Sequence, residues 1–113
     1  VTMYTPGADT AAHHSATLSE ANPVVQVANV RTRSVPQLRL DDHLASVLGR
    51  HERLDFLKVD VEGYEYPVFE GGVARIERDH PLIICEIEAR HNEEYGKAFG
   101  LLRSLGYKTF FHR

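Results

Sequence analysis

The stretch LDFLKVDVEGYEYPVFEGG, residues 54–72, decides the fold. Residues 56–61 are almost continuously apolar, and so short a run is typical of a strand buried on both faces, as in a parallel sheet. Gly63 allows the chain to turn, and residues 65–70 predict a helix that tolerates Pro67 in its first turn. In such a strand–turn–helix unit, ligands bind beyond the carboxyl end of the strand.

The flanking sequence predicts further strands and helices around this unit. It predicts a helix over residues 40–50 with Asp41 as N-cap, and a helical turn or two over 73–79 after the break at Gly71 and Gly72. A second buried strand is predicted over 81–88. A helix over 93–105, capped by Asn92 and stopped by Gly106, and a last strand over 107–111 complete the order. Helices and strands thus alternate from residue 41 onward. This order predicts an α/β sandwich with a largely parallel sheet.

Residues 1–37 form a less regular lead-in to that unit. Residues 1–5 predict an edge or hairpin strand, and residues 24–32 predict a strand that returns beside it. The small, polar residues 7–23 predict a loop, and the adjacent His13 and His14 within it are interpreted as solvated.

Size, composition and charge exclude several classes of protein. The chain has 113 residues, 42% hydrophobic and 26% charged, which suits one soluble domain and is too short for two. A net charge of −3 argues against a broad nucleic-acid-binding surface, and no apolar run approaches a membrane span or a signal peptide. The single cysteine, Cys85, excludes an internal disulfide and is interpreted as inert core. We therefore predict a cytoplasmic protein without membrane or nucleic-acid partners.

Acidic residues follow both predicted buried strands. Asp60 ends the first strand, and Glu86 and Glu88 end the second. If the strands are neighbours, these carboxylates face one opening, where one of them could act as a base. Lys58 shares a strand face with Asp60 and is interpreted as a charge partner of Asp60 or Glu86.

Three further interpretations concern the same opening. Glu62 and Glu65 suit the start of a helix, so each could be a cap that favours the helix dipole and nothing more. His91 is a candidate base or ligand near the crevice. The carboxylates of Asp60, Glu62 and Glu86 are ligands of the type that a hard divalent ion takes. No motif for zinc, phosphate-loop or serine-hydrolase chemistry occurs, however, and no metal is predicted.

Four segments together resemble the second half of FkbM-family methyltransferases. These are LRLDDHL, LDFLKVDVEGYEYPVFEGG, PLIICEIE and LLRSLGYKTF, of which LKVDVEGYE is the most specific. The resemblance covers most of the chain from residue 38 and, loosely, the residues before it. It implies a single partial domain over 1–113, with a lead-in over 1–37 and an α/β half over 38–113.

The resemblance also implies a fold and an activity. The fold is a partial Rossmann-like class I methyltransferase fold, in which residues 107–111 belong to a terminal hairpin with an antiparallel last strand. The activity is S-adenosylmethionine-dependent methylation of a hydroxyl on a sugar or natural product. Asp60 would face the methyl-transfer site and the cofactor, with Glu62 and Glu86 behind it and His91 as a further catalytic candidate.

The sequence departs from that family in one respect. The glycine-rich D-x-G-A-N-x-G turn and the following acidic motif, which bind the cofactor in the family, do not occur in these 113 residues. We therefore expect the chain to be inactive alone. The alternatives are a non-catalytic interaction module that forms a homo-oligomer through an open sheet edge, and a receiver-like phosphoacceptor domain, although the acidic pair that a receiver needs is missing from residues 1–7.

Overall fold

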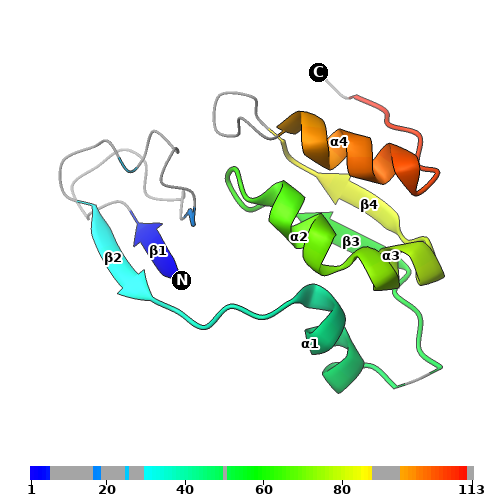
Figure 1. Ribbon diagram of the computed structural model, residues 1–113, viewed down its shortest axis with the longest axis horizontal. Helices are drawn as coiled ribbons and strands as arrows, with labels where there is room; N and C mark the ends of the chain where they lie inside the picture. Colours follow the sequence, from blue (N-terminus) through cyan, green and yellow to red (C-terminus); the bar gives the residue numbers. More distant parts are fainter. Residues whose placement is uncertain (6–16, 19–24, 26–29, 50, 88–94, 112–113) are drawn as a thin grey trace.

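The computed structural model describes residues 1–5, 17–18, 25, 30–49, 51–87 and 95–111 (Figure 1). Strands β1 (Thr2–Thr5) and β2 (Arg31–Ser34) pair antiparallel, with Thr2 opposite Ser34 and Thr5 opposite Arg31. An extended segment, residues 35–39, links this pair to a larger α/β unit (Figure 1).

The antiparallel pairing confirms the predicted first strand and its returning partner. The partner was predicted over residues 24–32, whereas β2 begins at Arg31 and all its residues are exposed. The antiparallel hydrogen bonding continues beyond the end of β2, since the Val35 N–H donates to the Val1 carbonyl at 2.9 Å. Backbone pairing with β1 therefore sets the position of β2. Residues 26–29 lie outside the described residues.

The α/β unit contains a parallel pair of strands. Strands β3 (Phe56–Val59) and β4 (Leu82–Cys85) run parallel, with Phe56 opposite Leu82 and Val59 opposite Cys85. The helices are α1 (Leu40–Val47), α2 (Glu65–Gly71), α3 (Val73–Asp79) and α4 (Tyr95–Ser104). The predicted mixed α/β order is confirmed, but the parallel sheet has only two strands among the described residues. None of the described helices is long and apolar enough to cross a membrane.

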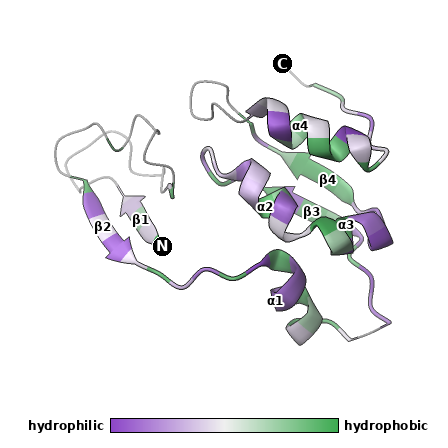
Figure 2. Ribbon diagram, in the orientation of Figure 1, coloured by the Kyte–Doolittle hydropathy of each residue, from purple (hydrophilic) through white to green (hydrophobic). Residues whose placement is uncertain are grey.

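The core lies between one face of this sheet and three helices. Val59 of β3, Phe69 of α2, Ile76 of α3, and Ala98 and Leu102 of α4 are at most 3% exposed. Alternate residues of each strand point to this face, and inward-facing residues such as Ile83 and Cys85 of β4 pack against the same cluster. Figure 2 shows the two strands as the apolar centre of the unit.

The opposite face of the sheet is open, which corrects the prediction of strands buried on both faces. Phe56, Leu82 and Ile84 are 49%, 67% and 54% exposed. The apolar run predicted burial correctly for one face only. Its other face is uncovered because the helices that pack on the sheet in the described residues pack on the same side.

The predicted last strand over residues 107–111 is wrong for the described structure. This segment is extended, and none of its described backbone hydrogen bonds reaches a strand. Tyr107 instead donates its hydroxyl to the Pro81 carbonyl at 2.9 Å, and Phe110 is 91% exposed. A β-branched and aromatic pattern forms a strand only where a neighbouring edge lies within hydrogen-bonding reach. The segment follows Gly106, whose φ of +85° confirms the predicted helix stop.

The carboxylate of Asp41 caps a different helix from the one predicted. The N-cap of α1 is Arg39, and Asp41 lies within the first turn of α1. Its two oxygens accept hydrogen bonds from the backbone N–H groups of Ala74 and Arg75, at 3.1 and 2.9 Å, in the first turn of α3. Asp41 thus satisfies α3 donors that have no partner inside the helix. The predicted N-cap of α4, Asn92, lies outside the described residues.

Candidate functional site

The carboxyl end of the parallel strands carries two exposed acidic side chains. The Glu86 N–H donates to the Val59 carbonyl at 3.0 Å, so the ladder continues one residue past β4. Asp60 and Glu86 therefore follow directly on neighbouring strands, at equivalent positions on the open face of the sheet. The strands are neighbours, which is the condition for their carboxylates to share one opening. We call Asp60 and Glu86 the acidic edge.

Lys58 is the charge partner of Asp60. Its ammonium lies 3.2 Å from the Asp60 carboxylate, and the two side chains are 64% and 42% exposed. An exposed pair of this kind contributes little to stability, about 0–1 kcal/mol. The pair places a positive charge beside the Asp60 carboxylate at the end of β3.

The chain after Asp60 makes a turn through two consecutive residues with positive φ. Glu62 has φ +47° and Gly63 has φ +96°. Glycine adopts such angles readily, whereas a glutamate there costs about 1 kcal/mol or more. Other contacts hold the turn: the Thr17 hydroxyl donates to the Glu62 carbonyl at 2.8 Å, and the Gly63 N–H donates to Glu65 Oε1 at 2.9 Å. A strained non-glycine residue next to the acidic edge is typical of functional sites.

Thr17 connects the lead-in to this turn, which the sequence analysis did not detect. Its backbone exchanges two hydrogen bonds with Tyr4 of β1, at 2.8 and 3.0 Å, and its side chain is 1% exposed. A threonine in a small, polar stretch carries no local signal of burial, because its partner Glu62 is 45 residues away.

Glu65, which the sequence offers as a possible helix cap, is buried at the start of α2. It is the first residue of α2 and is 1% exposed. Its carboxylate accepts a hydrogen bond from the Gly63 N–H. The pKa of the Cys85 thiol is raised mainly by the burial of the thiol and, second, by the negative charge of Glu65. Cys85 is half-buried and packs against the core, consistent with its interpretation as a core residue. Glu65 therefore binds the Gly63 turn on one side and lies close to the core residue Cys85 on the other.

A second charged cluster lies at the amino end of β3 and was also missed. The Asp79 carboxylate, 2% exposed, accepts hydrogen bonds from the Leu54 N–H at 2.8 Å and from the guanidinium groups of Arg75 and Arg78. These contacts, with the Arg78 bond as the largest cause, lower the pKa of Asp79 from 3.8 to about 2. Both arginines also donate to the Glu52 carbonyl. These contacts join the segment before β3 to α3. The cluster lies at the amino end of β3, and the acidic edge lies at the carboxyl end.

Two other residues predicted for the site, Glu88 and His91, lie outside the residues that the structure describes. The residues that the structure describes contain no group of three histidine, cysteine or acidic side chains able to hold a metal, so a divalent ion on Asp60, Glu62 and Glu86 finds no support in them.

The acidic edge fits one part of a ligand better than a whole nucleoside cofactor. Carboxylate oxygens accept hydrogen bonds from hydroxyl or ammonium groups. Asp60 and Glu86 are exposed, however, and among the residues that the structure describes none encloses the open face beside them. The edge alone therefore does not surround a ligand of the size of S-adenosylmethionine.

Open α/β sheets bind ligands beyond the carboxyl ends of their parallel strands, which is where Asp60 and Glu86 lie in this α/β domain. More specifically, the chain belongs to the FkbM methyltransferase family, since the model of the methyltransferase FkbM domain matches residues 1–109. The match confirms the resemblance and includes the lead-in, whose resemblance by motif is only loose. No curated protein and no solved structure matches the chain significantly.

Proposed function

We propose that this chain is part of an S-adenosylmethionine-dependent enzyme that methylates a hydroxyl oxygen of a sugar or natural product. Family membership supports the methyltransferase class. The observation that carries the finer assignment is the acidic edge, where Asp60 and Glu86 end neighbouring parallel strands beside a strained turn. Acidic side chains in this position suit an acceptor that carries hydroxyl groups.

The chemistry asked of these residues is limited. The cofactor supplies an activated methyl group when it is bound, so the protein has to align the acceptor oxygen and remove its proton. The Asp60 carboxylate, paired with Lys58, would accept that proton or hold the acceptor hydroxyl. Glu86 would bind a second hydroxyl of the acceptor, at a distance from Asp60 that the pairing of β3 and β4 sets. The Glu62 turn would follow directly after Asp60 and border the bound acceptor.

The 113 residues alone are proposed to lack a competent cofactor site, because the family's glycine-rich turn does not occur in them and the acidic edge is open. Isothermal titration calorimetry of the chain with S-adenosylmethionine tests this proposal. We expect no binding at micromolar concentrations. A dissociation constant in the micromolar range would refute it without touching the role of Asp60.

The role of Asp60 is tested in the polypeptide translated from the whole reading frame that encodes these residues. Transfer of a tritiated methyl group is measured on a panel of hydroxyl-bearing acceptors. The Asp60→Asn variant should lower kcat by about 100-fold or more, with the affinity for S-adenosylmethionine little changed.

The matched control is Asp55→Asn, at the amino end of the same region of chain. Asp55 is 81% exposed and pairs only loosely with Arg53, at 3.7 Å. Its substitution should leave kcat unchanged. Equal rates for Asp60→Asn and Asp55→Asn would contradict the proposed role, and methylation of nitrogen or carbon atoms alone would contradict the hydroxyl acceptor.

The open face of the sheet favours a second candidate, an interaction module that forms a homo-oligomer through its sheet. Phe56, Leu82 and Ile84 expose apolar surface there, and parallel sheets usually have both faces covered. Sedimentation velocity at micromolar concentration distinguishes the cases. A dimer that Ile84→Lys dissociates would support this candidate, and a monomer would exclude it.

A further inference from the structure

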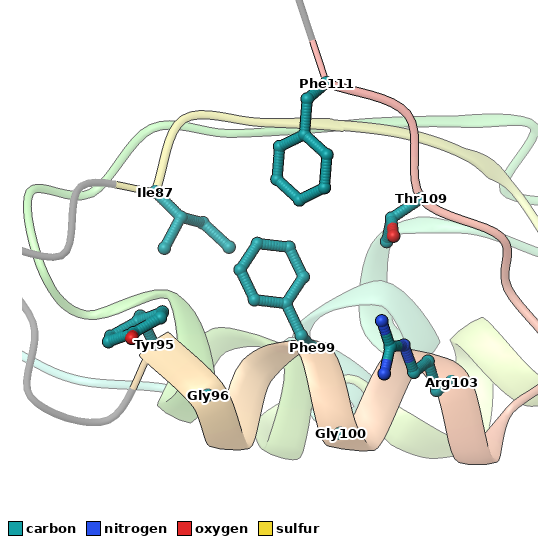
Figure 3. A pocket seen from close by; sticks show the side chains of 8 residues that line it. All are labelled: Ile87, Tyr95, Gly96, Phe99, Gly100, Arg103, Thr109 and Phe111. Atoms are coloured by element: carbon teal, nitrogen blue, oxygen red, sulfur yellow. The ribbon is translucent and has the colours of Figure 1, made fainter.

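A pocket of about 470 Å³ lies beyond the carboxyl end of β4, between α4 and the segment 107–111 (Figure 3). The side chains that line it are Ile87, Tyr95, Phe99, Arg103, Thr109 and Phe111. Because Ile87 follows Glu86 on the strand, it points to the opposite face of the sheet from the acidic edge. Binding in this pocket is therefore separate from the chemistry proposed above.

The middle of the pocket is apolar and aromatic. The rings of Phe99 and Phe111 lie 5.8 Å apart, tilted by 54°, and both point into the space between α4 and the terminal segment (Figure 3). Gly96 and Gly100 line the α4 side, and a Cβ added at either glycine would meet nothing within 4 Å beyond the nearby backbone of its own helix. The helix backbone is thus open to the approach of a flat ligand, which would lie against the two rings.

One end of the pocket is positively charged. Figure 3 shows the Arg103 guanidinium rising from α4 toward Thr109. No carboxylate within the described part of the chain forms an ion pair with Arg103, unlike Arg75 and Arg78, which both bind Asp79. A guanidinium beside a hydroxyl, with no carboxylate partner among these described residues, is suited to a carboxylate or phosphate.

We propose that this pocket binds a small amphiphilic anion, with a flat apolar body against Phe99 and Phe111 and its anionic group on Arg103. Charge complementarity selects the occupant, since a neutral apolar ligand would leave the guanidinium unused. Neither methyl transfer nor the acidic edge is needed for this binding.

The test titrates the ¹⁵N-labelled chain with 2-naphthoate, 2-naphthyl phosphate and the neutral 2-naphthalenemethanol, and follows the amide signals of Gly96 and Gly100 by NMR. We expect the anions to bind at least about fivefold more tightly than the alcohol. Whichever of the two anions binds more tightly identifies the anionic group.

Three variants make the result specific. Arg103→Gln should remove the preference for the anions, whereas the control Lys108→Gln, an exposed cation that does not line the pocket, should keep it. Gly100→Leu favours the helix and fills the open space, so it should weaken all three probes. Equal affinity of the alcohol and the anions for the unchanged chain, an unaltered preference in Arg103→Gln, or signal shifts centred on Phe56 and Ile84 would each overturn the proposal.

Discussion

Removing the charge of Asp79 is the sharpest test of how the segment before β3 is held. The substitution Asp79→Asn keeps the shape of the side chain and one acceptor for the Leu54 N–H. It removes the negative charge that faces Arg75 and Arg78. Because Arg75 is 9% exposed, its guanidinium would lose an ionic partner in a place with little access to water.

The size of the effect follows from the pKa of Asp79, which is lowered from 3.8 to about 2. A tenfold change in proton affinity corresponds to about 1.4 kcal/mol, so the folded state gains roughly 2 kcal/mol from the ionised carboxylate. This is an upper value, since Arg78, the main cause, is 47% exposed and water screens part of the interaction. Because the folded-state pKa is the lower one, this stability is present above about pH 4 and is lost as the pH falls toward 2.

Urea unfolding monitored by circular dichroism at pH 7, 4, 3 and 2.5 measures the effect. At pH 7, Asp79→Asn should lower the free energy of unfolding by about 2 kcal/mol, and the difference from the unchanged chain should shrink as the pH falls. The control Asp55→Asn, on an 81% exposed side chain, should change stability by less than about 0.5 kcal/mol. A gap between Asp79→Asn and the unchanged chain that stays constant from pH 7 to 2.5 would refute the reasoning.

Three further predictions concern contacts between distant segments, each checked by urea unfolding. Asp41→Ala should cost about 1 kcal/mol by uncapping α3, whereas Asp42→Ala in the same turn of α1 should cost much less; equal costs would contradict the capping role. Gly72→Ala should cost about 1–2 kcal/mol, because the new Cβ would lie 2.7 Å from a methyl carbon of the leucine that begins α1; a neutral result would mean that this leucine moves freely. Thr17→Val should cost about 1 kcal/mol by leaving the Glu62 carbonyl without the hydroxyl donor, and Thr17→Ser should recover part of the loss.

Local sequence patterns predicted the elements of the α/β unit because their causes are local. The apolar run around Val59, the inner stripe of α4 that includes Ala98 and Leu102, and the helix stop at Gly106 all depend on neighbours in the chain. The family signature LKVDVEGYE likewise lies within one unbroken stretch. The family and the placement of Asp60 at a strand end could therefore be predicted.

Partners far apart in the chain could not be predicted. Nothing near Asp41 indicates that it caps α3, and nothing near Thr17 indicates that it is buried against Glu62. A run of β-branched and aromatic residues likewise does not reveal whether a neighbouring strand edge is available, which is why residues 107–111 were wrongly predicted as a strand.

The sequence by itself determined the alternation of helices and strands, the family and the acidic residues at the strand ends, because periodicity, glycines and motifs act over a few residues. Only the tertiary structure decided that one sheet face is open, that Glu65 and Asp79 are buried, and that Asp60 stands beside Glu86. Burial and register depend on which distant segments meet, and a carboxylate is buried only where hydrogen-bond donors from those segments converge on it.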